Sequence, residues 1–271
     1  MHESVIRSLN EMNSNPLKIS IVTPSFNQGT FLEKTIQSVL SQDYPNLEYI
    51  IIDGGSTDKS VEIIKKYAER LSYWVSEPDA GQSDAINKGF RKASGDICAW
   101  INSDDVYYPG VLTIIAASFE EHPSVDLLYG YHNDVNEKDE VVRKGMYFPF
   151  YKHAFKVGFA ICQPTSFWKR KVWDICGPLD TNLHYCMDYD FYAKAIKVGF
   201  QVKSVPILIC KFRYHETNKS TTSRAGFAYE GEMLLSTHFG ERHQSFILGL
   251  VSKIELFLML GTRKLLRLFL K

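Results

Sequence analysis

Four consecutive residues, Asn102-Ser103-Asp104-Asp105, are the strongest local candidate for chemistry in this sequence. They directly follow residues 96–101, a largely apolar run that predicts a strand. Two adjacent carboxylates repel each other unless a cation or hydrogen-bond donors compensate, so this pair suits a hard divalent ion such as Mg²⁺ or Mn²⁺. The alternative is a solvated turn, because Asp and Asn also favour turns for backbone reasons.

A further carboxylate, Asp53, ends the apolar run of residues 47–52 and precedes a glycine-rich stretch. A carboxylate at a strand end can accept a hydrogen bond from a ligand N–H, for instance on a nucleobase. The alternative is a turn in which Ser56 or Thr57 caps the next helix. Neither a dinucleotide-binding glycine motif nor a P-loop occurs in the sequence, so carboxylates and a metal would have to hold any bound nucleotide.

The elements that must position these residues alternate between strand and helix in the first half of the chain. Apolar runs predict strands at residues 19–23, 47–52, 73–75 and 96–101, and helical spacing predicts helices at residues 30–40, 61–68 and 82–92. Such alternation predicts a mostly parallel sheet with helices on both faces and ligands beyond the carboxyl ends of the strands. In the second half we expect helices at 167–173 and 188–198, strands at 201–205 and 208–214, and helices from there to the end.

Composition excludes several classes of protein. The 271 residues are 45% hydrophobic and 23% charged, as in ordinary globular domains, and 31 basic residues balance 31 acidic ones. A zero net charge argues against a nucleic-acid binder. Five scattered cysteines without a CxxC pair predict reduced thiols. We expect no secretory signal, since the first 18 residues lack an apolar core, and no transmembrane helix.

Several segments in order resemble the family 2 glycosyltransferases, which are inverting enzymes of the GT-A fold. The resemblance covers residues 18–222. Its segments are ISIVTPSFN (19–27), IIDGGSTD (51–58), EPDAGQSDAINKG (77–89), AWINSDD (99–105), QPTSFW (163–168), GPLD (177–180), MDYDF (187–191) and FRYH (212–215). Each segment is loose alone, but their common order makes chance agreement improbable.

The resemblance implies an α/β fold of GT-A type, a mostly parallel sheet flanked by helices with a C-terminal helical tail. We expect an N-terminal extension (1–17), a catalytic domain (18–222) and a basic amphipathic helical segment (223–271). The implied activity is metal-dependent inverting transfer of a sugar from a nucleotide-diphosphate sugar, with UDP as the expected nucleotide, to a glycan or lipid-linked saccharide in cell-surface polysaccharide synthesis. The implied cofactor is Mn²⁺ or Mg²⁺.

Residue by residue, the resemblance implies one metal-binding group, one donor-binding group and one base. Asp104, supported by Asp105, and His215 would bind the metal. Asp188 would be the general base, with Asp190 as the fallback, although an Asp at this place can also be only a helix cap. The implied donor-binding residues are Thr23, Pro24, Ser25, Phe26, Asn27, Asp53, Asp79, Gln82, Asn87, Asn102 and Ser103. Gln163 and Trp168 are candidates for acceptor binding, although large aromatic side chains also commonly lie in the core.

Two positions depart from the family pattern: Asn102 replaces the first Asp of Asp-x-Asp, and Met187 replaces the Glu of Glu-Asp. If these mark a decayed site, the chain would be an inactive carbohydrate-binding module. Another alternative, a nucleotidyltransferase on a related fold, would need a basic glycine-rich loop after the first strand, and that loop is absent.

The neutral net charge hides two regions of opposite charge. Residues 72–110 carry a net charge of −3 and include Asp104, whereas residues 245–271 carry +4 on an apolar helical stripe. A basic amphipathic helix can lie in a membrane interface, or pack on the catalytic domain or a second subunit. We therefore expect a cytoplasmic protein, with peripheral contact to the inner face of the membrane or homo-oligomer contact through its C-terminal helices, and no nucleic-acid partner.

Overall fold

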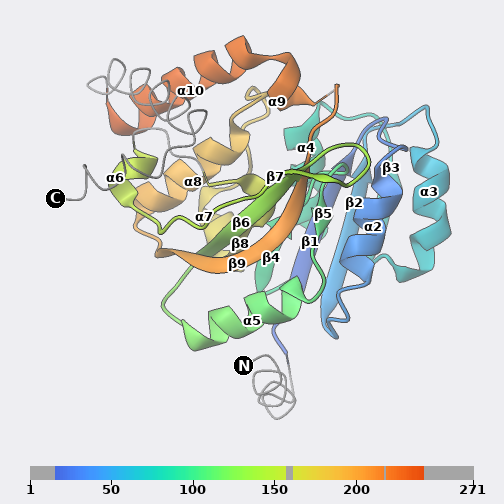
Figure 1. The fold of residues 1–271 in the computed structure, drawn as a ribbon, viewed down its shortest axis with the longest axis horizontal. Coiled ribbons are helices and arrows are strands. Elements are labelled where there is room, and N and C mark those ends of the chain that lie inside the picture. Colours follow the sequence, from blue (N-terminus) through green and yellow to red (C-terminus); the bar gives the residue numbers. More distant parts are fainter. Residues whose placement is uncertain (1–15, 157–160, 217, 241–271) are drawn as a thin grey trace.

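The computed structural model describes residues 16–156, 161–216 and 218–240 of the chain. In this part of the chain nine strands form one sheet (Figure 1). Eight of them follow the order β3-β2-β1-β4-β8-β6-β9-β5, and the ninth, β7, pairs with β6. The strands are β1 (Ile19–Ser25), β2 (Leu47–Asp53), β3 (Tyr73–Ser76), β4 (Ile97–Trp100), β5 (Val106–Tyr107), β6 (Leu127–Val135), β7 (Val141–Arg143), β8 (Ser166–Lys169) and β9 (Val202–Arg213). The α-helices are α2 (Leu32–Leu40), α3 (Ser60–Tyr67), α4 (Gln82–Lys92), α5 (Val111–Glu121), α6 (Lys152–Phe155), α7 (Arg170–Cys176), α8 (Met187–Val198), α9 (Lys219–Thr222) and α10 (Arg224–Phe239).

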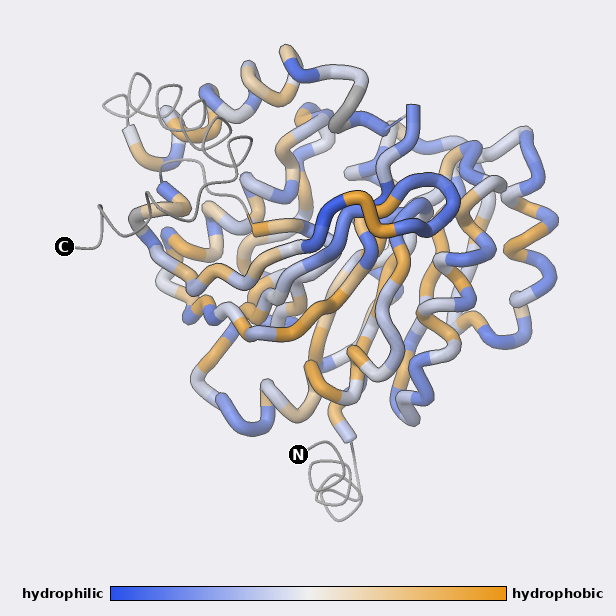
Figure 2. Tube along the Cα trace, viewed as in Figure 1, coloured by the Kyte–Doolittle hydropathy of each residue, from blue (hydrophilic) through white to orange (hydrophobic). Residues whose placement is uncertain are grey.

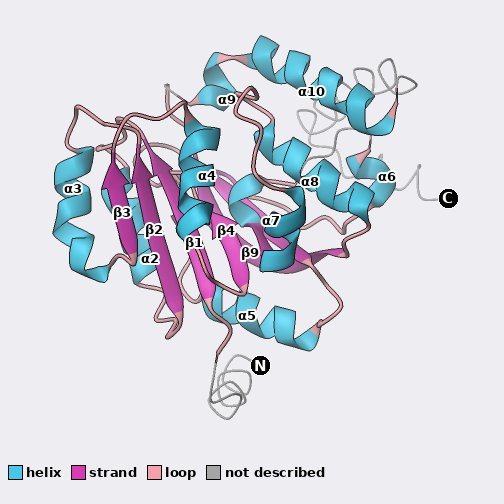
Figure 3. Ribbon diagram, turned by 180° about the vertical axis from the view of Figure 1, so that it is seen from behind, coloured by secondary structure: helices cyan, strands magenta, loops and turns pink. Residues whose placement is uncertain are grey.

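The first half of the chain forms the parallel part of the sheet, as the alternating pattern predicts. β1 pairs in parallel with both β2 and β4, and β2 pairs in parallel with β3. The arrowheads of β1, β2 and β3 accordingly point to one edge of the sheet (Figure 3). Beyond β4 the sheet is mixed, because β8 is antiparallel to both β4 and β6, whereas β6 and β9 are parallel. The predicted α/β class is confirmed, with more antiparallel pairing than expected.

Two apolar layers cover the sheet because successive side chains of a strand point to opposite faces. Ile21 and Ile51 pack with α2, α3 and α5, whereas Val22 and Ile52 pack with α4, α7, α8 and α10. The second group of helices lies in front of the sheet in the view from behind (Figure 3). Figure 2 shows the hydrophobic residues concentrated along the central strands.

The structure differs from the sequence prediction at several places. Residues 166–169, which overlap the start of the helix expected at 167–173, form β8, because they fill the gap between β4 and β6 with an antiparallel strand. The two strands expected at 201–205 and 208–214 are one strand, β9. Helix α5 and strand β6 were not predicted. Tertiary pairing, which residue patterns do not contain, therefore overrode the helical spacing at residues 167–169 only, and residues 170–173 begin helix α7 as predicted.

Helix α10 packs against α8, and its Leu234 and Leu235 are buried in the core. Residues 241–271, which include the basic amphipathic stripe, lie outside the described residues. Among the described helices, none is long and apolar enough to span a membrane.

Candidate active site

Three neighbouring strands end side by side at the carboxyl edge of the sheet. Ser25, Asp53 and Ser76, the last residues of β1, β2 and β3, face each other in register. Asp53 is fully buried, and its carboxylate accepts hydrogen bonds from the Ser76 hydroxyl (2.7 Å) and from the hydroxyl (2.6 Å) and backbone N–H (2.8 Å) of Ser56. This network stabilises a buried carboxylate at the place where the parallel strands open.

The loop after β1 is held by the loop after β2. The backbone N–H of Asn27 donates to the Ser56 hydroxyl (2.8 Å), and its side-chain oxygen accepts from the Thr57 N–H (2.9 Å). Asn27 has a φ of 52°, a left-handed conformation that Asn tolerates better than most residues. Phe26, the first residue after β1, is 59% exposed. The buried Thr23 lies deeper, where its hydroxyl is 3.1 Å from that of Tyr49.

The Asp79 carboxylate lies directly over Gly54 at the end of β2. A side chain at Gly54 would place its Cβ 2.6 Å from Asp79 Oδ2, so this approach requires glycine. The backbone N–H of Gly81 fixes the carboxylate by donating to Asp79 Oδ1 (2.8 Å). The structure thus brings Asp79 to the same edge as Asp53.

A chain of side-chain hydrogen bonds crosses from α4 to the last part of the site. Gln82 Nε2 donates to Asn102 Oδ1 (2.8 Å), and Lys219 Nζ donates to Gln82 Oε1 (2.9 Å) and to the carbonyl of His184 (3.2 Å). Gln82 and Asn102 are therefore in contact, as expected of residues in one site. Lys219 was not among the predicted site residues.

Asn87 is placed differently from the other predicted donor-binding residues. Its Nδ2 donates to the carbonyl of Leu179 (2.9 Å), its Oδ1 accepts from the Leu179 N–H (2.8 Å), and the residue is 5% exposed. Both polar ends of the Asn87 amide are thus used to hold helix α4 to the segment before α8.

Asp104 and His215 meet across 111 residues of sequence, with Asp104 Oδ2 3.0 Å from His215 Nε2. His215 is held against the ring of Phe31, with 4.7 Å between the ring centroids. Arg213, which is fully buried, donates through Nε to the Asp104 carbonyl (2.8 Å). A carboxylate and an imidazole at this separation are compatible with ligation of one divalent ion.

Asp105 does not join this pair. It is 1% exposed, and its Oδ1 accepts a hydrogen bond from the Arg213 N–H (3.0 Å). Burial, and then the neighbouring Asp104 charge, hold the pKa of Asp105 well above its usual range. Among the described residues, no group of three or more His, Cys, Asp or Glu side chains is arranged to hold a metal. Of the three predicted metal ligands, the structure therefore brings only Asp104 and His215 together.

The two candidate bases on α8 have opposite environments. Burial raises the pKa of Asp188 to about 6, and its Oδ1 accepts the backbone N–H of Tyr189 (2.8 Å). Asp190 instead forms ion pairs with Lys194 (2.7 Å) and His238 (2.8 Å). Burial alone would raise the pKa of Asp190, but these two partners hold that pKa below its usual value. Asp188 can accept a proton near neutral pH, whereas Asp190 is committed to holding α10 on α8.

The two acceptor candidates lie below the surface. Trp168 is 0% exposed and packs against Phe90, Trp100 and Phe191, so it does not stack on a sugar. That expectation was wrong, because Trp168 lies on the face of β8 that α4 and α8 cover. Gln163 is 7% exposed and donates to the Trp100 carbonyl (2.7 Å) at the end of β4.

Comparison with known proteins identifies the family. The family model described as "Glycosyl transferase family 2" matches residues 20–175, which is more than half of the chain. The chain belongs to glycosyl transferase family 2.

Relatives of this family 2 glycosyltransferase include two uncharacterized glycosyltransferases. The Mycobacterium tuberculosis relative is 29% identical over 234 residues, which cover 85% of this chain and 86% of the relative. The Rickettsia typhi relative is 26% identical over 231 residues, which cover 76% of this chain and 66% of the relative, slightly less than two thirds of its length.

Two solved structures share the GT-A fold of this glycosyltransferase. Residues 1–349 of S. aureus TarS, in complex with UDP-GlcNAc, align with a TM-score of 0.65 at 19% identity, covering 82% of this chain and 66% of that chain. A mannosyltransferase from Pyrobaculum calidifontis, in complex with GDP-Man and Mn²⁺, aligns with a TM-score of 0.56 at 17% identity, covering 88% and 68%. Likeness at these identities establishes the fold of the transferase.

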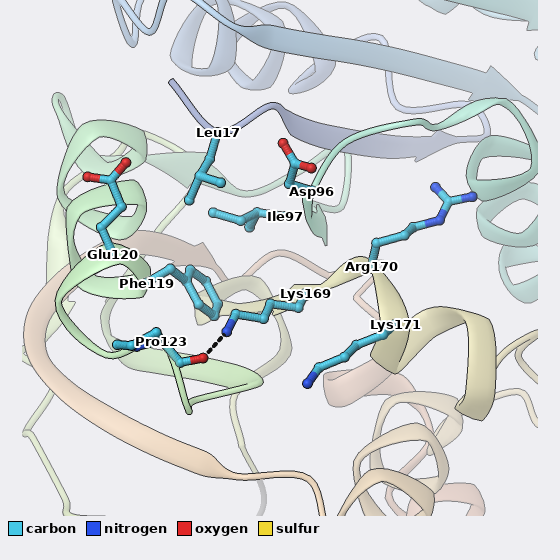
Figure 4. A pocket seen from close by; sticks show the side chains of 9 residues that line it. All are labelled: Leu17, Asp96, Ile97, Phe119, Glu120, Pro123, Lys169, Arg170 and Lys171. Carbon is cyan, nitrogen blue, oxygen red and sulfur yellow. Dashed lines mark hydrogen bonds between the residues drawn. The ribbon is translucent and has the colours of Figure 1, made fainter. Parts of the chain in front are cut away.

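A cavity of about 400 Å³ lies at the opposite end of the glycosyltransferase sheet (Figure 4). It opens beside Leu17 and Asp96, which precede β1 and β4, and is therefore remote from the carboxyl edge. The basic side chains around it are already paired, with Lys169 on the Pro123 carbonyl, Arg170 on Asp174 and Lys171 on Asp126. The three basic side chains that line this cavity therefore do not mark an anion site, and the edge that carries Asp53 and Asp104 remains the candidate site.

Two residues beside the candidate site, Lys219 and Glu230, were missed by sequence reasoning. Lys219 lies four residues after His215 and could have been suspected from that proximity. Glu230, at 7% exposure, accepts hydrogen bonds from the loop before Asp188. A lone Glu in a helical pattern carries no signal of this role, because only packing of α10 on α8 brings it to the loop.

Proposed function

We propose that this chain transfers a sugar from a nucleotide-diphosphate sugar, with UDP as the expected nucleotide, to a hydroxyl of a glycan or lipid-linked saccharide, with inversion at the anomeric carbon. The observation that carries the proposal is the 3.0 Å approach of Asp104 Oδ2 to His215 Nε2 at the carboxyl edge of the sheet. Family membership supports it, as do TarS, whose structure holds UDP-GlcNAc, and the mannosyltransferase, whose structure holds GDP-Man and Mn²⁺.

For the donor, we assign the nucleoside to the edge formed by Asp53 and residues 23–27, and the ribose and diphosphate to Asp79, Gln82, Asn102 and Ser103. Ser25 supports this assignment, because its buried Oγ has no hydrogen-bond partner among the described residues. Lys219 Nζ, 2.9 Å from Gln82 Oε1, adds a positive charge where the diphosphate would lie. Asn87 acts on this site indirectly, by holding α4.

For the cation, Mn²⁺ or Mg²⁺, we assign Asp104 and His215 as ligands, with Asp105 as a buried support. When bound, such an ion supplies Lewis-acid neutralisation of the departing diphosphate. The fit rests on the short Asp104–His215 approach and on the chemistry of the two donors, one carboxylate and one imidazole.

For the base, we assign Asp188. The acceptor hydroxyl loses its proton to the Asp188 carboxylate as its oxygen bonds to the anomeric carbon, and the bond from that carbon to the diphosphate oxygen breaks. A pKa of about 6 leaves Asp188 mostly ionised at pH 7 yet basic enough to take a proton. One base without a carboxylate nucleophile accounts for the inversion.

The test is release of nucleoside diphosphate from UDP-GlcNAc, UDP-glucose and GDP-mannose, with Mn²⁺ and with EDTA. We expect turnover of at least one donor that EDTA abolishes. Asp104→Ala and Asp188→Asn should each lower turnover by at least ~100-fold, the range for removal of a positioned base, with UDP binding retained in Asp188→Asn as measured by calorimetry. Glu121→Ala, an exposed change at the end of α5, is the control.

Two outcomes would contradict these assignments. Turnover that is unchanged in Asp104→Ala would remove the metal assignment. An absence of both turnover and nucleotide binding across the three donors would contradict the donor class.

The acceptor and cellular context belong to the same proposal. A lipid-linked saccharide in cell-surface polysaccharide synthesis is consistent with the +4 charge and apolar stripe of residues 245–271, which would draw the protein to an anionic membrane surface.

A further inference from the structure

The loop that precedes Asp188 rests on one buried carboxylate from a distant helix. Glu230, in the middle of α10, accepts the backbone N–H of three consecutive residues, His184, Tyr185 and Cys186, each at 2.8 Å. Oε1 accepts the first, and Oε2 accepts the other two. Cys186 is the N-cap residue of α8, and Asp188 is in the first turn of that helix.

Other contacts show that α10 and this loop are closely packed. A Cβ at Gly226, one turn before Glu230, would lie 2.3 Å from the Tyr185 ring, so the ring needs a glycine there. The rings of Tyr185 and Phe227 pack with centroids 5.1 Å apart, and Cys186 Sγ lies 3.6 Å from the Phe227 carbonyl. The carboxylate therefore acts within a contact that leaves the loop little room to shift.

We propose that Glu230 is a positioning residue for the catalytic base, fixing residues 184–186 and hence the place of Asp188 against the acceptor hydroxyl. The inference rests on the proposed function, in which Asp188 is the base. The N–H groups just before a helix and in its first turn have no partner within the helix, and a charged acceptor binds them more strongly than a neutral one. A base displaced by about 1 Å loses on the order of 10²-fold in rate.

The same carboxylate also influences the proton affinity of Asp188. The groups that act electrostatically on Asp188 are Glu230 on α10, Cys186 on the loop, Cys162 before β8, and Tyr192 on α8. Burial raises the pKa of the thiols and the phenol of this set, so they stay neutral between pH 5 and 8. Removing the negative charge of Glu230 should therefore lower the pKa of Asp188, a shift that a substitution at an exposed position of the same helix should not produce.

The experiment compares Glu230→Gln and Glu230→Ala with the matched control Glu232→Gln, which changes an exposed residue of the same helix. In the full chain with Mn²⁺, we expect nucleoside diphosphate release from UDP-GlcNAc to fall about 10-fold in Glu230→Gln and about 100-fold in Glu230→Ala. Gln should rescue in part, since its oxygen can still accept two of the three N–H groups. UDP affinity should stay within twofold of the unaltered protein in all three variants.

Two further readouts separate positioning from loss of fold. The acidic limb of the pH–rate profile should move to lower pH in Glu230→Gln. Amide hydrogen exchange should accelerate at residues 184–186 in Glu230→Ala and stay unchanged in α4. Amide hydrogen exchange that is unchanged at residues 184–186 in Glu230→Ala would overturn the proposal, even if no donor is turned over. Rates and pH–rate profiles of the Glu230 variants equal to those of Glu232→Gln would overturn it as well.

Asp188→Asn, measured in parallel, distinguishes the two proposals. If Asp188→Asn retains turnover, the assignment of the base fails. If Asp188→Asn abolishes turnover while the Glu230 variants match the control, only the role of Glu230 fails.

Discussion

At the residue scale, Asp188 and Asp190 show how two carboxylates in one helical turn acquire different tasks. Both lie in the first turn of α8, where the helix N-terminus favours negative charge. Asp190 is held by His238 and Lys194, which stabilise its ionised form. Asp188 is half-buried and has no cationic partner among the described residues, and desolvation raises its pKa. The environment, and not the residue type, separates a structural carboxylate from a proposed base.

The ionised form of Asp188 should also lower the stability of the fold at neutral pH. Its pKa is raised from 3.8 to about 6, so the folded state favours the protonated form. The resulting stabilisation is fully present below pH 3.8 and is lost as pH rises through about 6. We expect Asp188→Asn, which stays neutral, to exceed the unaltered protein in free energy of unfolding by about 2–3 kcal/mol at pH 7.5.

Urea denaturation of both proteins between pH 4 and pH 8 measures this difference. The gap should be small at pH 4, grow toward pH 6 and level off above it. A gap that is constant over this range would show that Asp188 does not titrate between the folded and unfolded states as described.

At the scale of elements, close contact between α4 and β1 sets the place of Gln82. Gly89 on α4 lies against the fully buried Val22 of β1, and a Cβ at Gly89 would be 2.3 Å from Val22 Cγ1. The helix therefore approaches the sheet more closely than a larger residue would permit. Gln82, at the first position of α4, depends on this approach to reach Asn102.

Two glycine substitutions should have opposite effects on the free energy of unfolding, because only one of the two glycines is packed against a neighbouring side chain. Gly89→Ala should lower the free energy of unfolding by about 1–3 kcal/mol, because Val22 has no room to move. Gly231→Ala, on α10, should raise it by about 0.5–1 kcal/mol, because a Cβ there meets nothing within 4 Å and Ala favours the helix. Thermal unfolding measures both changes. Equal effects of the two substitutions would contradict the packing difference.

At the scale of the whole molecule, the site is assembled from most of the described chain. Asp104 and His215 are separated by 111 residues, and Glu230 reaches His184 from 46 residues away. α10 falls beyond the boundary expected at residue 222, yet Leu234, Leu235 and Glu230 are buried against the rest of the protein. This burial predicts that the catalytic domain extends through α10.

Truncation of the chain tests whether α10 is part of the catalytic domain. A chain ending at residue 240 should unfold cooperatively, whereas one ending at residue 222 should lose at least ~3 kcal/mol from the two buried leucines and the Glu230 hydrogen bonds. Circular dichroism during urea denaturation measures the difference. Equal stability of the two chains would support a domain boundary near residue 222.

Co-sedimentation with anionic phospholipid vesicles should be stronger for the full chain than for the chain ending at 240.

The sequence by itself determined the elements whose signals are local. β1, β2, β3 and α4 agree with prediction to within two residues, because alternating and helical apolar spacing reflects a strand or helix wherever it packs. The order of the motifs also predicted the meeting of Asp104 and His215. Only the tertiary structure decided that residues 166–169 form a strand, that Trp168 is core, that Asp188 and Asp190 differ, and that Glu230 reaches the loop before Asp188. Each of these depends on which distant segment lies alongside, and burial and hydrogen bonds between such segments leave no periodic trace in the chain.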